Sequence, residues 1–233
     1  MSDIAAVCFD LDSTLCVANQ SDNDIHQEVF ESAGIDPIFT PADIRAVDSA
    51  EIETAESDAE FYTNLYRATV SNLPTSPDVD TAVLRELGEI TTDVVDETDV
   101  SFRPAAEDAL DYARRHYEIG LITNGGQKTQ QEKLETLGIK DMFDVRVFCD
   151  PTQGINPKPA SEPFREAVAK LSASAEEVIH IGDDHSTDVV GAHTAGLQSA
   201  WVPHLRPHES LPGTPDPTPT FQLDSLADVS TIL

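Results

Sequence analysis

The chain has 233 residues, of which 43 are acidic and only 14 are basic, giving a formal net charge of −29 at pH 7. This charge argues against nucleic acid or an anionic membrane surface as a partner, since both would repel the protein. The length fits one large domain, or one domain that carries a smaller inserted one. No apolar stretch reaches the roughly 18 residues that a membrane-spanning helix requires.

Three cysteines, Cys8, Cys16 and Cys149, lack the spacing of a metal site and are odd in number. We expect them to be reduced, apolar side chains in a cytoplasmic protein, because Asp3 follows Met1 too closely for a signal peptide. The acid excess, with only five lysines, is typical of proteins from salt-loving organisms, in which salt screens the self-repulsion.

A β-type run at residues 4–9 opens the chain, and a segment of different character follows at residues 17–100. That segment has few β-branched runs, and its apolar residues recur at helical spacing, as at Val83, Leu87 and Ile90. The pattern predicts an inserted helical domain of three to five helices.

After the insertion, strand and helix patterns alternate. Such alternation predicts a Rossmann-like α/β fold, in which residues 1–16 and 101–233 form a parallel sheet with helices on both faces. A proline-rich, irregular loop is expected at residues 203–219, before a short strand near Phe221 and a helix from about Leu226. The expected strands are 118–123, 145–149, 178–182 and 199–202, and the expected helices are 104–116, 128–137, 161–171 and 186–195.

Two carboxylates, Asp10 and Asp12, stand at the end of the first apolar run. Residues two apart in an extended chain point the same way. Side-by-side carboxylates repel each other unless a cation or a shared proton joins them. An Asx-type turn at a strand end would explain one of these acids readily, and two less well.

The next two strands also end in polar groups. Thr123, Asn124 and Gly125 offer a hydroxyl and a backbone that can approach an anion closely, although many strands end in this way. Lys158 follows the next strand and lies between two prolines, which fix its backbone. Lys158 read alone would be an ordinary surface lysine about as often as a functional one.

The fourth strand is followed by an acidic cluster that includes Asp183, Asp184 and Asp188. Carboxylate oxygens are the ligands that Mg²⁺ prefers. His185 within this cluster is more often an exposed loop residue than a base or a zinc ligand. Because ligands of parallel α/β sheets bind beyond the carboxyl ends of the strands, all four groups are expected to meet at one edge.

In chain order, these four groups resemble the motifs of the haloacid dehalogenase-like (HAD) hydrolase superfamily. The matching stretches are DLDST at residues 10–14, Thr123 in LITNG, Lys158 in NPKP and GDDHSTD at residues 182–188. The insertion directly after the first motif is similar to the family's helical cap of the first type.

The resemblance implies a role for each matching residue. Asp10 would be the nucleophile that forms an aspartyl-phosphate, and Asp12 would be the general acid and then the general base. Thr123 would hydrogen-bond the phosphoryl oxygens, and Lys158 would neutralise their charge. The expected phosphate-binding residues are Thr123, Asn124, Gly125 and Lys158.

The resemblance also implies a Mg²⁺ site and a substrate class. The ligands would be Asp10, the backbone carbonyl of Asp12, and Asp183, with Asp188 either a further ligand or an orienter of Lys158. We therefore expect a Mg²⁺-dependent phosphatase of small phosphorylated metabolites, with phosphoglycolate, sugar phosphates and nucleotides as candidate substrates.

Three other functions stay open. A 2-haloacid dehalogenase of the superfamily uses the first Asp on carbon, but lacks the second Asp and needs no metal, so Asp12 argues against it. A phosphomutase keeps both aspartates and the cap. A non-catalytic binding protein on this fold is expected to have lost some of the acids, and none is missing here.

Four side chains of the insertion could face a substrate, namely Arg45, Arg67, Tyr62 and Tyr66. Residues of this kind more often serve packing or the protein surface than substrate binding.

Overall fold

The computed structural model describes residues 3–75, 77–205 and 214–233. The chain divides into two compact units, which we describe separately. The α/β unit joins Met1–Ala18 to Thr98–Leu233, and the helical unit is Asn19–Glu97.

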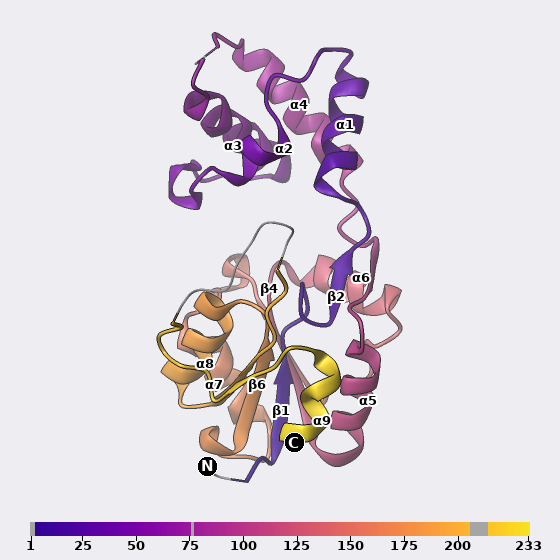
Figure 1. The fold of residues 1–233 in the computed structure, drawn as a ribbon, viewed down its shortest axis with the longest axis vertical. Helices are drawn as coiled ribbons and strands as arrows, with labels where there is room; N and C mark the ends of the chain where they lie inside the picture. The colour runs from indigo at the N-terminus through magenta and orange to yellow at the C-terminus, as the bar shows by residue number, and fades with distance from the viewer. Residues whose placement is uncertain (1–2, 76, 206–213) are drawn as a thin grey trace. The chain divides into compact units, whose positions relative to one another are not determined.

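A sheet of six strands forms the centre of the α/β unit in the described part of the chain, in the order β5-β4-β1-β6-β7-β8. Each neighbouring pair is parallel, and β1 runs beside β4 and β6 (Figure 1). Phe9 at the end of β1 pairs with Leu121 of β4 and Ile181 of β6. The predicted parallel α/β sheet is confirmed. The strands are β1 (Ala6–Phe9), β4 (Glu118–Asn124), β5 (Val145–Cys149), β6 (Val178–Gly182), β7 (Gln198–Trp201) and β8 (Phe221–Gln222).

The residues of β1 alternate between two hydrophobic cores, one on each face of the sheet. Val7 and Phe9 belong to one core, and Ala6 and Cys8 belong to the other. All four side chains are fully buried, which fixes the register of the strand and the direction of the residues that follow it. Helices α5 (Ala106–His116), α6 (Gln127–Thr136) and α9 (Val229–Ile232) contribute to the first core, and α7 (Ser161–Lys170) and α8 (Val190–Ala195) to the second.

A short antiparallel pair, β2 (Cys16–Ala18) with β3 (Val100–Phe102), lies where the chain leaves the α/β unit and returns to it. This pair is not among the strands predicted from the sequence. The guanidinium of Arg103, a buried residue directly after β3, donates to three backbone carbonyls, those of Ser13, Val202 and Pro203, at 2.8–3.0 Å. Arg103 thereby ties the turn after β1 to the chain after β7.

The helical unit has four α-helices in its described residues, within the predicted three to five. Each begins with a Ser, Thr or Asp side chain that accepts a backbone N–H, as helix N-termini require. The unit has its own apolar core, which includes Phe30, Phe39 and Leu87. Its helices are α1 (Asp22–Ala33), α2 (Pro41–Arg45), α3 (Asp58–Asn72) and α4 (Thr81–Val94).

The basic and aromatic side chains singled out in the insertion are engaged within the helical unit. Arg45 and Arg67 form ion pairs with carboxylates of the same unit, at 2.7 and 3.0 Å. The ring of Tyr62 packs against that of Tyr66, whose hydroxyl is 2.7 Å from the Thr91 hydroxyl. Packing and surface ion pairs thus account for these four residues.

Two expectations for the end of the chain need correction. The helix expected at 186–195 begins as a π-helical turn, His185–Val189, and becomes α-helical only at α8. The closing helix is a 3₁₀ turn, Leu226–Asp228, followed by the four residues of α9. The loop expected at 203–219 is irregular where the structure describes it, at residues 203–205 and 214–219. Residues 206–213 lie outside the described part.

Cys8, Cys16 and Cys149 are buried and free, as predicted. Burial raises the pKa of the Cys8 and Cys16 thiols to about 12 and that of Cys149 to about 11, which keeps them protonated. Across the described residues, the structure contains no helix with the length and apolar character needed to cross a bilayer.

Candidate active site

A cavity of about 210 Å³ opens at the carboxyl edge of the sheet in the α/β unit. It contains seven of the eight predicted site residues, and Gly125 is the one that does not line it. The four strand-end groups therefore come together as predicted. The cavity is lined by Asp10, Asp12, Ser13, Thr123, Asn124, Lys158, Asp183, Asp184, Thr187 and Asp188.

Lys158 is the positive centre of the cavity. Its Nζ lies 2.6 Å from Oδ1 of Asp10 and 2.7 Å from Oδ1 of Asp188, and its side chain is only 2% exposed. Burial alone would lower the pKa of Lys158, but the two carboxylates raise it above its usual value. Lys158 therefore stays charged, with its ammonium fixed between two acids.

The backbone of Lys158 is fixed by Asn124. The Lys158 N–H donates to Oδ1 of Asn124 at 2.8 Å, and Nδ2 of Asn124 donates to the Lys158 carbonyl at 3.3 Å. The side chain of Asn124, which was expected to bind phosphate, thus uses both its donor and its acceptor to join the end of β4 to the lysine loop.

Asp188 projects from the π-helical turn toward β6. Its Oδ1 accepts from Nε2 of His180 at 2.9 Å as well as from Lys158, and its Oδ2 accepts from the Asp184 N–H at 3.1 Å. Burial favours the protonated acid, but Lys158 and His180 hold the pKa of Asp188 below its usual value. Both oxygens of Asp188 therefore already have protein donors.

Asp10 and Asp183 are less well compensated. The Thr14 hydroxyl lies 3.2 Å from Oδ2 of Asp10 and 3.0 Å from Oδ1 of Asp183, but its single proton can serve only one of them at a time. Burial and the charge of Asp188 raise the pKa of Asp10 to about 8, even with Lys158 beside it. Burial and Asp188 likewise raise the pKa of Asp183 to about 6.

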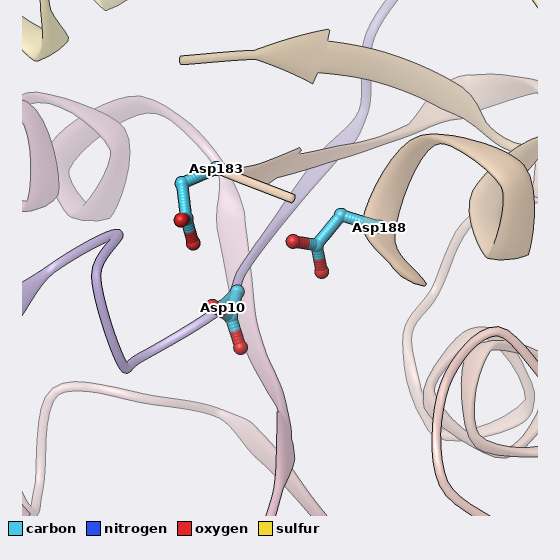
Figure 2. Close-up of side chains that lie close together, drawn as sticks. All are labelled: Asp10, Asp183 and Asp188. Carbon is cyan, nitrogen blue, oxygen red and sulfur yellow. The ribbon is translucent and has the colours of Figure 1, made fainter. Parts of the chain in front are cut away.

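These acids fit a divalent cation. Asp10, Asp183 and Asp188 each offer a carboxylate oxygen, and the three oxygens lie within 4.8 Å of one another (Figure 2). Lys158 contacts two of these carboxylates, Asp10 and Asp188. Burial, and then the charge of Asp188, raise the pKa of Asp10 and Asp183. Oxygen donors with uncompensated negative charge are what Mg²⁺ requires.

Asp12 is held from a different direction, by helix α6. Nζ of Lys133 lies 2.8 Å from Oδ1 of Asp12, and Nε2 of Gln130 lies 2.9 Å from Oδ2. Neither residue is among the predicted site residues. The one hint in the sequence is the scarcity of lysine, since Lys133 is one of only five lysines in a chain of charge −29.

The remaining polar residues of the fourth motif hold its turn in place. The Asp184 carboxylate accepts from the Thr187 N–H at 3.0 Å and from the Ser186 hydroxyl at 2.6 Å. Nε2 of His185 donates to the Pro217 carbonyl at 2.8 Å. His185 is thus a partly buried residue of the π-helical turn, and not the exposed loop residue that was expected. Thr14 and His180, which contact the site carboxylates, are also absent from the predicted site residues. His180 is predicted only as part of the strand at 178–182.

Fold and site together define a Rossmann-like α/β protein with a carboxylate- and lysine-lined cavity at the carboxyl edge of its sheet. The sequence model of the haloacid dehalogenase-like hydrolase family matches residues 7–202, which include all four motifs. The chain therefore belongs to the haloacid dehalogenase-like hydrolases.

Several known proteins are similar to this chain. Pyrophosphatase PpaX of Bacillus cereus (strain B4264) is 30% identical over 139 residues, which make up 59% of this chain and 62% of PpaX, so less than two thirds of that relative is covered. The magnesium-bound YfnB of Bacillus subtilis aligns at a TM-score of 0.73 and 21% identity, over 100% of this chain and 99% of YfnB. A Thermotoga maritima protein named as a β-phosphoglucomutase aligns at 0.70 and 21%, over 98% of each chain. At such identities these two structures show a shared fold.

Proposed function

We propose that this protein is a Mg²⁺-dependent phosphatase that hydrolyses small phosphorylated metabolites through an aspartyl-phosphate intermediate. One observation carries the proposal: Asp10, Asp12 and Lys158 line the same small cavity. A nucleophile, a proton donor and a positive charge are the groups that phosphate ester cleavage needs.

In the first step, a carboxylate oxygen of Asp10 attacks phosphorus. The bond between phosphorus and the alcohol oxygen breaks, its electron pair goes to that oxygen, and the proton of Asp12 neutralises the leaving alcohol. The Lys158 ammonium, 2.6 Å from Asp10, favours the ionised nucleophile and offsets the phosphoryl charge. The Thr123 hydroxyl at the end of β4 is the proposed donor to a phosphoryl oxygen.

In the second step, a water molecule attacks phosphorus. The water gives a proton to the Asp12 carboxylate, and the bond between phosphorus and Asp10 breaks. Phosphate leaves, and Asp12 is again protonated for the next turnover. The same carboxyl group thus acts as acid and then as base, which requires that it lie close to phosphorus in both steps.

The proposed magnesium site uses Asp10, Asp183 and the backbone carbonyl of Asp12. When bound, Mg²⁺ would supply positive charge that favours ionised Asp10 and offsets the charge of the phosphoryl group. Both oxygens of Asp188 accept from protein donors, so we assign it as the residue that orients Lys158. Asn124 positions the Lys158 backbone, and Gly125 gives the turn its shape.

We further propose that residues 17–100 form the cap domain, residues 1–16 and 101–233 form the core domain, and the cap selects the substrate. Phosphoglycolate, sugar phosphates and nucleotides remain candidates, and the name of PpaX adds inorganic pyrophosphate to the compounds worth testing. The net charge supports a protein that works in high salt and binds neither nucleic acid nor membranes. The free cysteines support a cytoplasmic location.

Phosphate release from a panel of these compounds, measured in high salt, tests the proposal. Hydrolysis should require Mg²⁺, stop in EDTA and return when Mg²⁺ is restored. Full activity in EDTA would remove the metal role of Asp183. Release of halide from 2-haloacids would favour a dehalogenase, and isomerised sugar phosphate without free phosphate would favour a phosphomutase. A folded, metal-replete protein that is inert on the whole panel would favour a binding protein.

A further inference from the structure

We infer that Lys133 and Gln130 are positioning residues for Asp12, so that helix α6 fixes the carboxyl group that transfers protons in the reaction. The inference rests on the proposed phosphatase function. Lys133 and Gln130 lie three positions apart on α6 and therefore on one face of that helix. Each donates to a different oxygen of Asp12, at 2.8 and 2.9 Å.

The burial of Lys133 is the first argument. Its side chain is only 10% exposed, whereas that of its partner Asp12 is 43% exposed. A half-exposed carboxylate needs no buried partner for stability, and lysine is one of the residues least often buried. Desolvation of the ammonium is therefore a cost that stability alone does not explain. What this burial provides is a donor in a fixed place beside Asp12.

Gln130 supplies the second argument, because it joins Asp12 to the second motif. Its Nε2 donates to the Asn124 carbonyl at 3.0 Å as well as to Asp12. The backbone of Gly125 makes room for this amide: a Cβ at Gly125 would lie 2.5 Å from Nε2, and the φ of +125° is one that side-chain-bearing residues rarely adopt. Gly125, which does not line the cavity, thus contributes by leaving space for Gln130.

Two donors on two oxygens restrict rotation of the carboxyl group of Asp12. In the proposed mechanism this group must reach the leaving oxygen and then the attacking water, and small misplacement of such a group is costly. Losing Lys133 should therefore slow the proton-dependent part of the reaction, while Asp10, Lys158 and the metal ligands stay in place.

Leaving-group dependence distinguishes this role from a structural one. An alkyl phosphate needs a proton on its leaving oxygen, whereas p-nitrophenolate departs without one. The ratio kcat/KM reports events up to the departure of the leaving group. For an alkyl phosphate, Lys133→Met should lower kcat/KM by roughly 10- to 100-fold. The kcat/KM for p-nitrophenyl phosphate should be nearly unchanged.

Three further variants complete the test. Lys133→Arg keeps a cation and should recover much of the kcat/KM that Lys133→Met loses on the alkyl phosphate. Gln130→Met should lower kcat/KM less than Lys133→Met does, and again mainly for the alkyl phosphate. Lys128→Met removes an exposed lysine from the same helix and should have no effect. If Lys133→Met does not fold, Gln130→Met is the test: a loss confined to the alkyl phosphate supports the positioning role, and an equal loss on both substrates overturns it.

Equal loss on both substrates, or no loss on either, would overturn the positioning role. A wild-type protein that hydrolyses neither ester in the presence of Mg²⁺ would instead overturn the proposed function. The two failures are therefore distinct, because the first leaves an active wild-type enzyme.

Discussion

Asp183 is partly buried, lies near other carboxylates and is a proposed metal ligand. It shares the one hydroxyl proton of Thr14 with Asp10, and its pKa is raised to about 6 from the ordinary 3.8. An acid whose pKa is raised in the folded state contributes stability that is complete below its unfolded pKa and is lost as pH rises through the folded value. Without metal, ionised Asp183 therefore destabilises the fold near neutral pH.

Replacing Asp183 by Asn should accordingly stabilise the metal-free protein. The raised pKa means that ionised Asp183 lowers the free energy of unfolding by roughly 3 kcal/mol. We therefore expect the variant to have a free energy of unfolding about 1–3 kcal/mol higher than the wild type at about pH 8. Thermal unfolding in EDTA as a function of pH measures it, and the gain should shrink as the pH falls below 6.

Asp183→Asn also tests the metal site, because the substitution that stabilises the metal-free protein should weaken stabilisation by Mg²⁺. Mg²⁺ should stabilise the wild-type protein and should stabilise Asp183→Asn much less, because a ligand is lost. Asp184→Asn removes the neighbouring charge and should keep the wild-type response to Mg²⁺. An equal response in Asp183→Asn and wild type would exclude Asp183 as a ligand.

At this scale, much of the cavity was predictable. Asp10, Asp12, Lys158 and Asp183 follow strands, and the carboxyl ends of parallel strands meet. Lys133 was not predictable in the same way, because it lies in a helix, QKTQQEKLET, whose single apolar residue, Leu134, is too little to reveal the buried face.

Among the elements, the π-helical turn His185–Val189 has the most direct effect on the site. It begins three residues after β6 ends and turns Asp188 back toward the strand. The close approach depends on Gly182, since a Cβ there would lie 2.2 Å from Cγ of Asp188. Single π turns occur mostly inside α-helices and frequently at functional sites, and this one brings a carboxylate to Lys158.

Gly182→Ala should therefore displace Asp188 and with it Lys158. Overpacking of this kind costs roughly 1–3 kcal/mol, and we expect a loss of that size together with a large fall in kcat. Gly126→Ala is the matched control for stability, because a Cβ at Gly126 meets nothing within 4 Å. Thermal melts and phosphate release measure both effects, and a Gly182→Ala protein with wild-type melting temperature and kcat would refute this account of the turn.

The strands of the main sheet were predictable, including the short strand expected near Phe221, which is β8, whereas β2, β3 and the π turn were not. The strands expected at 145–149 and 178–182 match β5 and β6, because each is a compact run rich in β-branched or aromatic residues. Strands β2 and β3 have three residues each, too few to show a period of two. The π turn depends on the packing of Asp188, which no local pattern records.

For the molecule as a whole, the net charge of −29 opposes both compaction and the approach of an anionic substrate. Positive charge within the site therefore matters more than it would in a neutral protein. The same charge makes ionic strength a determinant of stability, because exposed acids along the whole chain repel one another.

Salt should accordingly stabilise the fold. Raising KCl from about 0.1 M to about 1 M shortens the screening length from about 10 Å to about 3 Å. We expect the melting temperature, measured in EDTA, to rise across this range, and to rise equally in NaCl if the cause is screening. A melting temperature that falls with salt would contradict the interpretation of the charge as an adaptation to high salt.

The central claim is that Asp10 carries the phosphoryl group during turnover. Its most direct test is mass spectrometry of the peptide containing Asp10, after acid quenching of the enzyme during hydrolysis of a phosphate ester with Mg²⁺. We predict one added phosphoryl group on Asp10 in the wild-type protein, and neither this adduct nor turnover in Asp10→Asn. Phosphate release that continues at most of the wild-type rate in Asp10→Asn would contradict the account.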